Sequence, residues 1–168
     1  MRTYFFIILL VFTSFISCDK DLELDKNINS LYFNSFELSS DTVGWIGISK
    51  GDIIKDAPES GGNKSLRVSG GCVIPHKYFK TAPLVEDCSV VLKCWGKNLS
   101  NGGGVSLHKE YEYNSIYISV SNTSWTNYVS IDTLHCNAGS SLILELNSGG
   151  IMSSAMLIDL IEIIKLDN

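Results

Sequence analysis

Arginine, proline and charged residues are all scarce in this sequence. The arginines are Arg2 and Arg67, prolines number 3, and 18% of the 168 residues are charged. The net charge of −5, without a basic cluster, excludes the electrostatic surface that nucleic-acid binding requires. A hydrophobic share of 45% is too high for a chain that is disordered throughout, and the length suits one domain.

The motifs of common metal sites and enzymes are also missing. The three histidines are scattered and no Cys-x-x-Cys pair occurs, so a zinc site has no support. The sequence contains no His-Glu-x-x-His or phosphate-loop motif. Glu110 and Glu112 fall in a predicted loop, which lacks the fixed separation of a two-carboxylate mechanism. We therefore expect a protein that is not an enzyme.

The N-terminus has the pattern of a secretory signal peptide. After Arg2, an apolar run extends to residue 16 and is shorter than the about 20 residues that span a bilayer. Residues 15–18, Phe-Ile-Ser-Cys, resemble the lipobox of bacterial lipoproteins. This resemblance implies a lipoprotein signal peptide over residues 1–17 and a triacylated Cys18, whose acyl chains (diacylglycerol and palmitate) are enough for stable anchoring.

Residues 18–30 then form a charged tether, and residues 31–168 a single domain. The tether resembles the acidic export tags of surface lipoproteins in Bacteroidota, and a plain solvated linker explains its composition equally well. In both readings we expect the protein to be anchored by lipid in the outer membrane, with its domain facing the periplasm or the cell surface.

Four cysteines remain if Cys18 carries lipid: Cys72, Cys88, Cys94 and Cys136. Outside the cytoplasm they are able to form disulfides in three full pairings. Cys88 and Cys94 lie six residues apart in one predicted strand, roughly 20 Å, whereas a disulfide needs Cα atoms within about 7 Å. Some or all of these thiols are alternatively small buried hydrophobic groups.

The domain is predicted to consist of β-strands, because short segments alternate apolar and polar residues between clusters of Gly, Asn and Ser. The last segment also fits a helical spacing, but its isoleucines favour a central strand with both faces covered.

Five segments in order resemble jelly-roll carbohydrate-binding modules with a galactose-binding-like domain. They are residues 34–37 with Gly44-Trp45, then residues 60–68, 90–97, 125–128 and 157–163. The resemblance implies an all-β fold, an antiparallel β-sandwich (jelly roll) of about eight to ten strands. It also implies eight main strands, which would lie at residues 64–70, 72–79, 88–97, 103–108, 115–121, 125–135, 141–147 and 155–166. Successive strands would alternate between the two sheets, and the third and sixth strands would be neighbours.

Several residue roles follow from this resemblance alone. Neighbouring third and sixth strands would bring Cys88 near Cys136, which makes this pair the expected disulfide and leaves Cys94 buried and reduced. Glu37 and Asp159 match ligands of a structural calcium that many members hold, although solvent-facing carboxylates at strand ends would look the same in sequence. Trp45 and Trp125 match core positions.

A carbohydrate site needs flat apolar surfaces beside hydrogen-bonding groups. If the alternating apolar residues face inward, His108, Tyr117 and Glu145 face outward on one sheet, and Tyr111 and Tyr113 lie in a nearby loop. We expect the three tyrosines to stack on sugar rings, with His108 and Glu145 as polar partners. The alternative interpretation of the same residues is an exposed hairpin that carries tyrosines and binds no ligand. Trp95 falls on the opposite sheet.

These observations predict an outer-membrane lipoprotein whose domain binds a polysaccharide or other glycan without catalysis. The alternative is a lipoprotein that binds another protein, such as an envelope assembly component or a toxin-immunity factor. A small glycosidase or lyase is the third hypothesis.

Overall fold

The computed structural model describes residues 29–71, 77–150 and 152–167. They form two antiparallel sheets, here called sheet A and sheet B, which pack face to face. The fold class is therefore the predicted all-β antiparallel sandwich. Cys18 and Cys72 lie outside the described residues, as do the signal-peptide segment and most of the tether.

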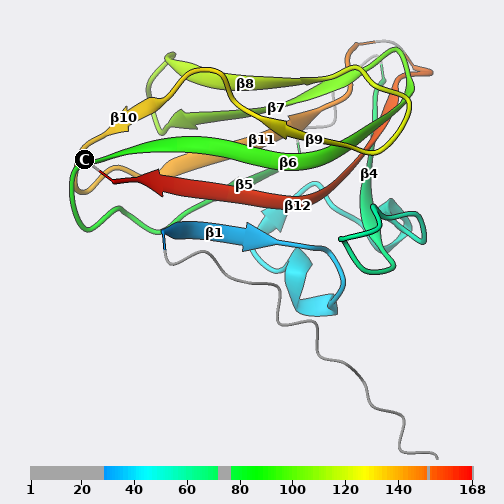
Figure 1. Ribbon diagram of the computed structural model, residues 1–168, viewed down its shortest axis with the longest axis horizontal. Coiled ribbons are helices and arrows are strands. Elements are labelled where there is room, and N and C mark those ends of the chain that lie inside the picture. Colours follow the sequence, from blue (N-terminus) through cyan, green and yellow to red (C-terminus); the bar gives the residue numbers. More distant parts are fainter. Residues whose placement is uncertain (1–28, 72–76, 151, 168) are drawn as a thin grey trace, which may run out of the picture.

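Sheet A has seven strands in the order β10-β6-β12-β4-β3, with β1 beside β12 and β9 beside β6. Figure 1 shows β6 and β12 running side by side, with β1 flanking β12. The strands of sheet A are β1 (Ser30–Asn34), β3 (Ile53–Ile54), β4 (Ser65–Ser69), β6 (Cys88–Ser100), β9 (Thr126–Val129), β10 (Leu134–Cys136) and β12 (Ala155–Leu166).

Sheet B has five strands in the order β2-β5-β11-β7-β8. They are β2 (Trp45–Ile46), β5 (Lys77–Lys80), β7 (Gly103–Lys109), β8 (Ser115–Val120) and β11 (Leu142–Asn147). Two short 3₁₀ helices, η1 (Ser39–Thr42) and η2 (Lys50–Asp52), lie in the connections between β1 and β3. No helix in the described part of the chain has the length and apolar character needed to cross a membrane.

The strand prediction is correct in order and needs three corrections. First, the predicted sixth strand is two strands, β9 and β10, because Ser130 turns its hydroxyl to the backbone of Leu92 and Asp132 between them. Second, β7 and β8 form a hairpin within sheet B, so the predicted alternation between sheets is interrupted once. Third, the described residues contain twelve strands rather than about eight to ten, because short segments also pair before β4.

The core lies between the sheets and follows the predicted alternation. In β8, Ile116, Ile118 and Val120 are buried, whereas the residues between them are exposed. β12 is a strand, as predicted, and its residues from Ala155 to Ile163 are all buried because it is central to sheet A. The strand neighbours β6, β9 and β10 confirm that the third and sixth predicted strands are adjacent.

Candidate functional site

The outer face of sheet B carries the side chains predicted to bind a glycan. Cross-strand register places Glu145 of β11, Ser106 of β7 and Tyr117 of β8 in one row, since directly paired residues share a face of the sheet. The next row contains Ile143, His108 and Ser115. The predicted outward orientation of His108, Tyr117 and Glu145 therefore agrees with the strand register.

Four of the five predicted residues line one hollow of about 570 Å³ at the β7–β8 end of this face. His108 Nε2 stands 3.9 Å from Glu145 Oε2. Tyr111 and Tyr113, in the loop between β7 and β8, are almost entirely exposed, at 94% and 103%. This hollow, which we call the His108 hollow, also contains Glu112, so acidic groups and freely exposed aromatic rings characterise it.

The fifth predicted residue, Tyr117, is directed away from the His108 hollow. It pairs with Ser106, yet a Cβ atom built on Gly104 would stand only 1.9 Å from Tyr117 Oη. The ring therefore lies across Gly104, two residues from Ser106 along β7. There Tyr117 borders a second hollow of about 440 Å³, here called the Tyr117 hollow.

The acidic residues of the β7–β8 loop are paired with lysines. Glu110 Oε1 lies 2.6 Å from Lys80 Nζ, and Glu112 Oε2 lies 2.8 Å from Lys109 Nζ. The hydrogen bond from Lys80 lowers the pKa of Glu110. A glycosidase general acid needs the opposite shift, a raised pKa that keeps its proton near neutrality. The geometry around Glu110 therefore gives no support for a catalytic carboxylate pair.

Glu37 and Asp159, the predicted calcium ligands, converge on the loop that precedes β4. Glu37 Oε1 accepts hydrogen bonds from the backbone N–H groups of Asn63 and Lys64, at 2.7 Å and 2.6 Å. Asp159 is fully buried, and a Cβ atom on Gly61 would stand 2.2 Å from its Oδ2. Only glycine at residue 61 lets the backbone approach this carboxylate so closely.

The electrostatics of this carboxylate pair are unusual. Asp159 Oδ1 accepts the N–H of Leu160, whereas Oδ2 is buried and has no hydrogen-bond partner among the residues that the structure describes. Burial raises the pKa of Asp159 to about 8, with a further contribution from the negative charge of Glu37. Each carboxylate also adjoins a residue with left-handed backbone, Phe36 (φ 55°) and Leu160 (φ 47°). Such strain in non-glycine residues clusters at ligand sites.

An orphaned carboxylate oxygen beside a second carboxylate fits a hard cation such as calcium. Among the described residues, no three His, Cys, Asp or Glu side chains gather closely enough to hold a metal ion. Backbone carbonyls would have to supply the remaining ligands, because calcium takes six to eight oxygens.

The predicted disulfide partners are directly opposite each other. Cys136 of β10 pairs with Cys88 of β6, and both are buried with free thiols in the structure, so the expected bond is not formed there. Cys94 is also a free thiol, fully buried, and burial raises its pKa to about 12. This environment is that of an inert structural cysteine.

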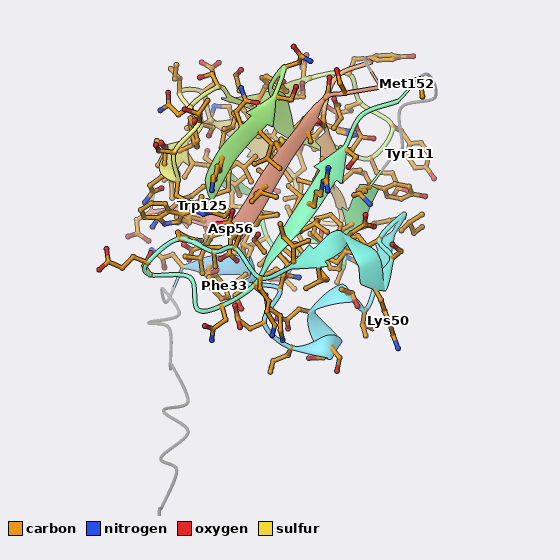
Figure 2. The ribbon with its side chains drawn as sticks, turned by 90° about the vertical axis from the view of Figure 1, so that its right-hand side faces the viewer. Phe33, Lys50, Asp56, Tyr111, Trp125 and Met152 are labelled. Atoms are coloured by element: carbon orange, nitrogen blue, oxygen red, sulfur yellow. The ribbon has the colours of Figure 1, made fainter. Side chains whose placement is uncertain are left out.

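The tryptophans differ in their surroundings. Trp45 is in the core, as predicted, and stacks at an angle on Phe36 and Phe79. Trp125 is only half-buried, and its indole N–H donates a hydrogen bond to Asp56 Oδ1 at 2.8 Å. Figure 2 shows Trp125 and Asp56 together on one side of the sandwich, with Tyr111 on the opposite side. Trp125 therefore holds a loop against sheet A rather than filling the core.

Sequence reasoning missed several residues that share a hollow with Tyr117. Ser119 and Asn147 lie in it, on β8 and β11 respectively. Gly104, on which the Tyr117 ring packs, was predicted only as part of the strand at residues 103–108. The signal available in sequence was the third consecutive glycine, which a tight turn does not need.

Comparison with known proteins identifies the fold without a family. No protein-family model matches the sequence, and no curated protein matches it. Among solved structures, the CBM22-1 xylan-binding domain of Paenibacillus barcinonensis Xyn10C has a TM-score of 0.54 at 15% identity, over 83% of this chain and 96% of that domain.

Two larger proteins contain a similar sandwich. The mosquito-larvicidal Cry4Aa toxin of Bacillus thuringiensis gives a TM-score of 0.53 at 9% identity, over 73% of this chain and 22% of the toxin. The enzymatically active domain of tailspike protein 4 from bacteriophage CBA120 gives a TM-score of 0.54 at 13% identity, over 74% of this chain and 20% of that protein. The chain thus spans about a fifth of these two proteins, and the likeness is one of fold.

Proposed function

We propose that this protein binds a polysaccharide or other glycan on the outer face of sheet B, without catalysis. The observation that carries the proposal is the combination of exposed tyrosines with polar groups on one sheet face. Sugar C–H faces pack on aromatic rings, and sugar hydroxyls need nearby donors and acceptors. The similarity to a xylan-binding domain over nearly its whole length supports the same function.

Affinity electrophoresis tests the proposal. The purified domain is run in native gels that contain xylan, a mixed-linkage β-glucan, galactomannan or polygalacturonate, beside gels without polysaccharide. Retardation by at least one polysaccharide, without release of reducing ends or unsaturated products, is the expected result. Normal migration in every gel would contradict the proposal. Co-purification with a stoichiometric protein would then favour the alternative, a protein-binding role.

Anchoring at the outer membrane through a lipid on Cys18 is part of the same proposal. It is supported by the apolar run and the lipobox-like residues 15–18. Cys18→Ser should abolish incorporation of labelled palmitate and release the protein from the membrane fraction. Equal labelling of the wild type and the variant would contradict lipidation at this residue.

We also propose that Glu37 and Asp159 bind a structural calcium ion. The buried, unpartnered Oδ2 of Asp159 supports this assignment, since ionising that carboxylate without a cation would be costly. A bound cation would supply positive charge and link the loop before β4 to β12. The ion would act on stability, because Asp159 belongs to β12 of sheet A and Glu37 to the connection after β1, whereas the tyrosines belong to β8 and the β7–β8 loop of sheet B.

A further inference from the structure

Of the three predicted stacking residues, Tyr117 is the one whose ring packs on the sheet backbone, over Gly104, and we call this position the seat of the ring. The three atoms nearest to a Cβ built on Gly104 are all in the Tyr117 side chain, at 1.9–2.4 Å. One face of the ring therefore covers the β7 backbone, while the side chain as a whole stays 53% exposed. A ring held in this way presents a flat apolar surface to solvent.

The Tyr117 hollow differs chemically from the His108 hollow. None of its lining residues is charged; they include Ser119, Ser121, Asn98 and Asn147. The side-chain polar atoms of Tyr117, Ser119 and Asn147 make no hydrogen bond to other described residues. Asn98, by contrast, is used internally, since it accepts the N–H of Gly102 and donates to the backbone of Ser121. The hollow thus offers uncommitted neutral donors and acceptors beside an aromatic ring.

We propose that Gly104 and Tyr117 together form the subsite for an uncharged sugar ring, with Ser119 and Asn147 as its hydrogen-bonding partners. This inference rests on the proposed glycan-binding function and specifies its position and ligand class. Gly104 is a positioning residue, because it does not touch the sugar and acts by leaving room for the Tyr117 ring against β7. An acidic polysaccharide has no cationic partner among the lining residues of this hollow.

Pre-organisation favours this subsite over the tyrosines in the β7–β8 loop. Tyr111 and Tyr113 are almost entirely exposed, so a ligand would have to immobilise both rings, although the hydroxyl of Tyr111 interacts with Glu110. Such ordering opposes binding by about 0.5–1.5 kcal/mol per side chain. The Tyr117 ring is already held against β7, and a stacked sugar gains its contact area without that cost.

Gly104→Ala tests the seat without removing the tyrosine. Gly104 does not have the positive φ that disfavours alanine, and its nearest obstacle is the movable Tyr117 side chain rather than backbone. The variant should fold with a melting temperature close to that of the wild type, but the Cβ atom of the alanine should displace the Tyr117 ring from the β7 backbone. Tyr117→Ala removes the ring, Tyr117→Phe keeps it, and Tyr113→Ala serves as the matched tyrosine control.

Binding to xylan, mixed-linkage β-glucan, galactomannan and polygalacturonate is measured by affinity electrophoresis for all five proteins. We expect retardation of the wild type by a neutral polysaccharide, and about tenfold weaker binding for Gly104→Ala and Tyr117→Ala. Tyr113→Ala should weaken binding less than Tyr117→Ala does, because a ligand would first have to order the exposed Tyr113 ring, and Tyr117→Phe should retain most of the affinity. NMR checks the seat separately, because a ring over Gly104 shifts its Hα signals upfield and Tyr117→Ala abolishes this shift.

The outcomes separate the subsite from the general function. Wild-type retardation that survives Gly104→Ala and Tyr117→Ala would overturn the subsite and leave glycan binding intact. Retardation by polygalacturonate alone would overturn the assignment to uncharged sugars. Absence of retardation in every gel would overturn both proposals, and an unshifted Gly104 Hα signal would overturn the seat whatever the binding result.

Discussion

Oxidation of Cys88 and Cys136 should stabilise the domain by joining β6 to β10. Directly opposed residues of antiparallel strands have Cα atoms about 4.5–5.5 Å apart, inside the range of about 4.4–6.8 Å that disulfides require. These two cysteines are direct partners in the β10–β6 register, and both are buried free thiols. Rotation of the side chains would therefore bring the sulfurs together with little backbone movement.

The magnitude follows from the loop that the bond would close. Residues 88 to 136 form a loop on the order of 50 residues, and restricting it in the unfolded chain stabilises the fold by about 4 kcal/mol. For a domain of this size, roughly 3 °C per kcal/mol converts this to an increase in melting temperature of about 12 °C.

The assay compares thermal unfolding after treatment with oxidised glutathione and after dithiothreitol. The wild type should show the full difference in melting temperature, and Cys136→Ser should show none. Cys72→Ser and Cys94→Ala are matched controls that should keep the difference. A non-reducing peptide map that links Cys72 to Cys88, or an oxidised Cys88–Cys136 form that melts with the reduced protein, would refute the reasoning.

Three other predictions concern stability. Calcium at 100 times its dissociation constant should stabilise the wild type by about 2.7 kcal/mol and have no effect on Asp159→Asn; a melting temperature unchanged by EDTA would argue against the site. Trp125→Phe should lower the free energy of unfolding in urea by about 1–2 kcal/mol, because the variant keeps an aromatic ring but loses the indole N–H that donates to Asp56. A variant as stable as the wild type would refute this. Lys77→Met should cost about 1–3 kcal/mol at pH 7, since buried Lys77 lies 2.7 Å from Asp52. Burial tends to raise the pKa of Asp52, but hydrogen bonds from Lys77 and Ser49 lower it below its ordinary 3.8. The stability from the pair is therefore present above pH 3.8 and lost as the pH falls through the lower folded pKa. The difference between wild type and Lys77→Met should shrink in acid, and a constant difference would contradict the pairing.

The sandwich was predictable because alternation of apolar and polar residues is a local property of an extended chain. Val90 and Leu92 of β6 face the core of the sandwich, and so do Ile116 and Ile118 of β8, as their period of two requires. The same pattern correctly identified His108, Tyr117 and Glu145 as outward-facing. At β12 the spacing was ambiguous, and the preference of β-branched residues for strands gave the correct assignment instead.

The arrangement of the candidate sites depended on contacts between segments that are distant in sequence. Tyr117 was expected beside His108 and Glu145, but its ring lies over Gly104 of the adjacent strand, so the predicted single site is two hollows. Periodicity assigns a side chain to a face of a sheet, and it contains no information on the direction in which that side chain lies along the face.

The alternating sequence by itself thus determined the long strands of the sandwich, their order along the chain and the composition of the core, because these follow from local periodicity and burial. The short strands before β4 and the division between β9 and β10 depended on tertiary contacts. Tertiary structure alone decided the environment of individual polar groups. Asp159 is one carboxylate among many in sequence; its complete burial in β12, with the charge of Glu37 nearby, raises its pKa to about 8. The side chains opposite a residue, and the water they exclude, are set by strand register and loop packing, which no local pattern specifies.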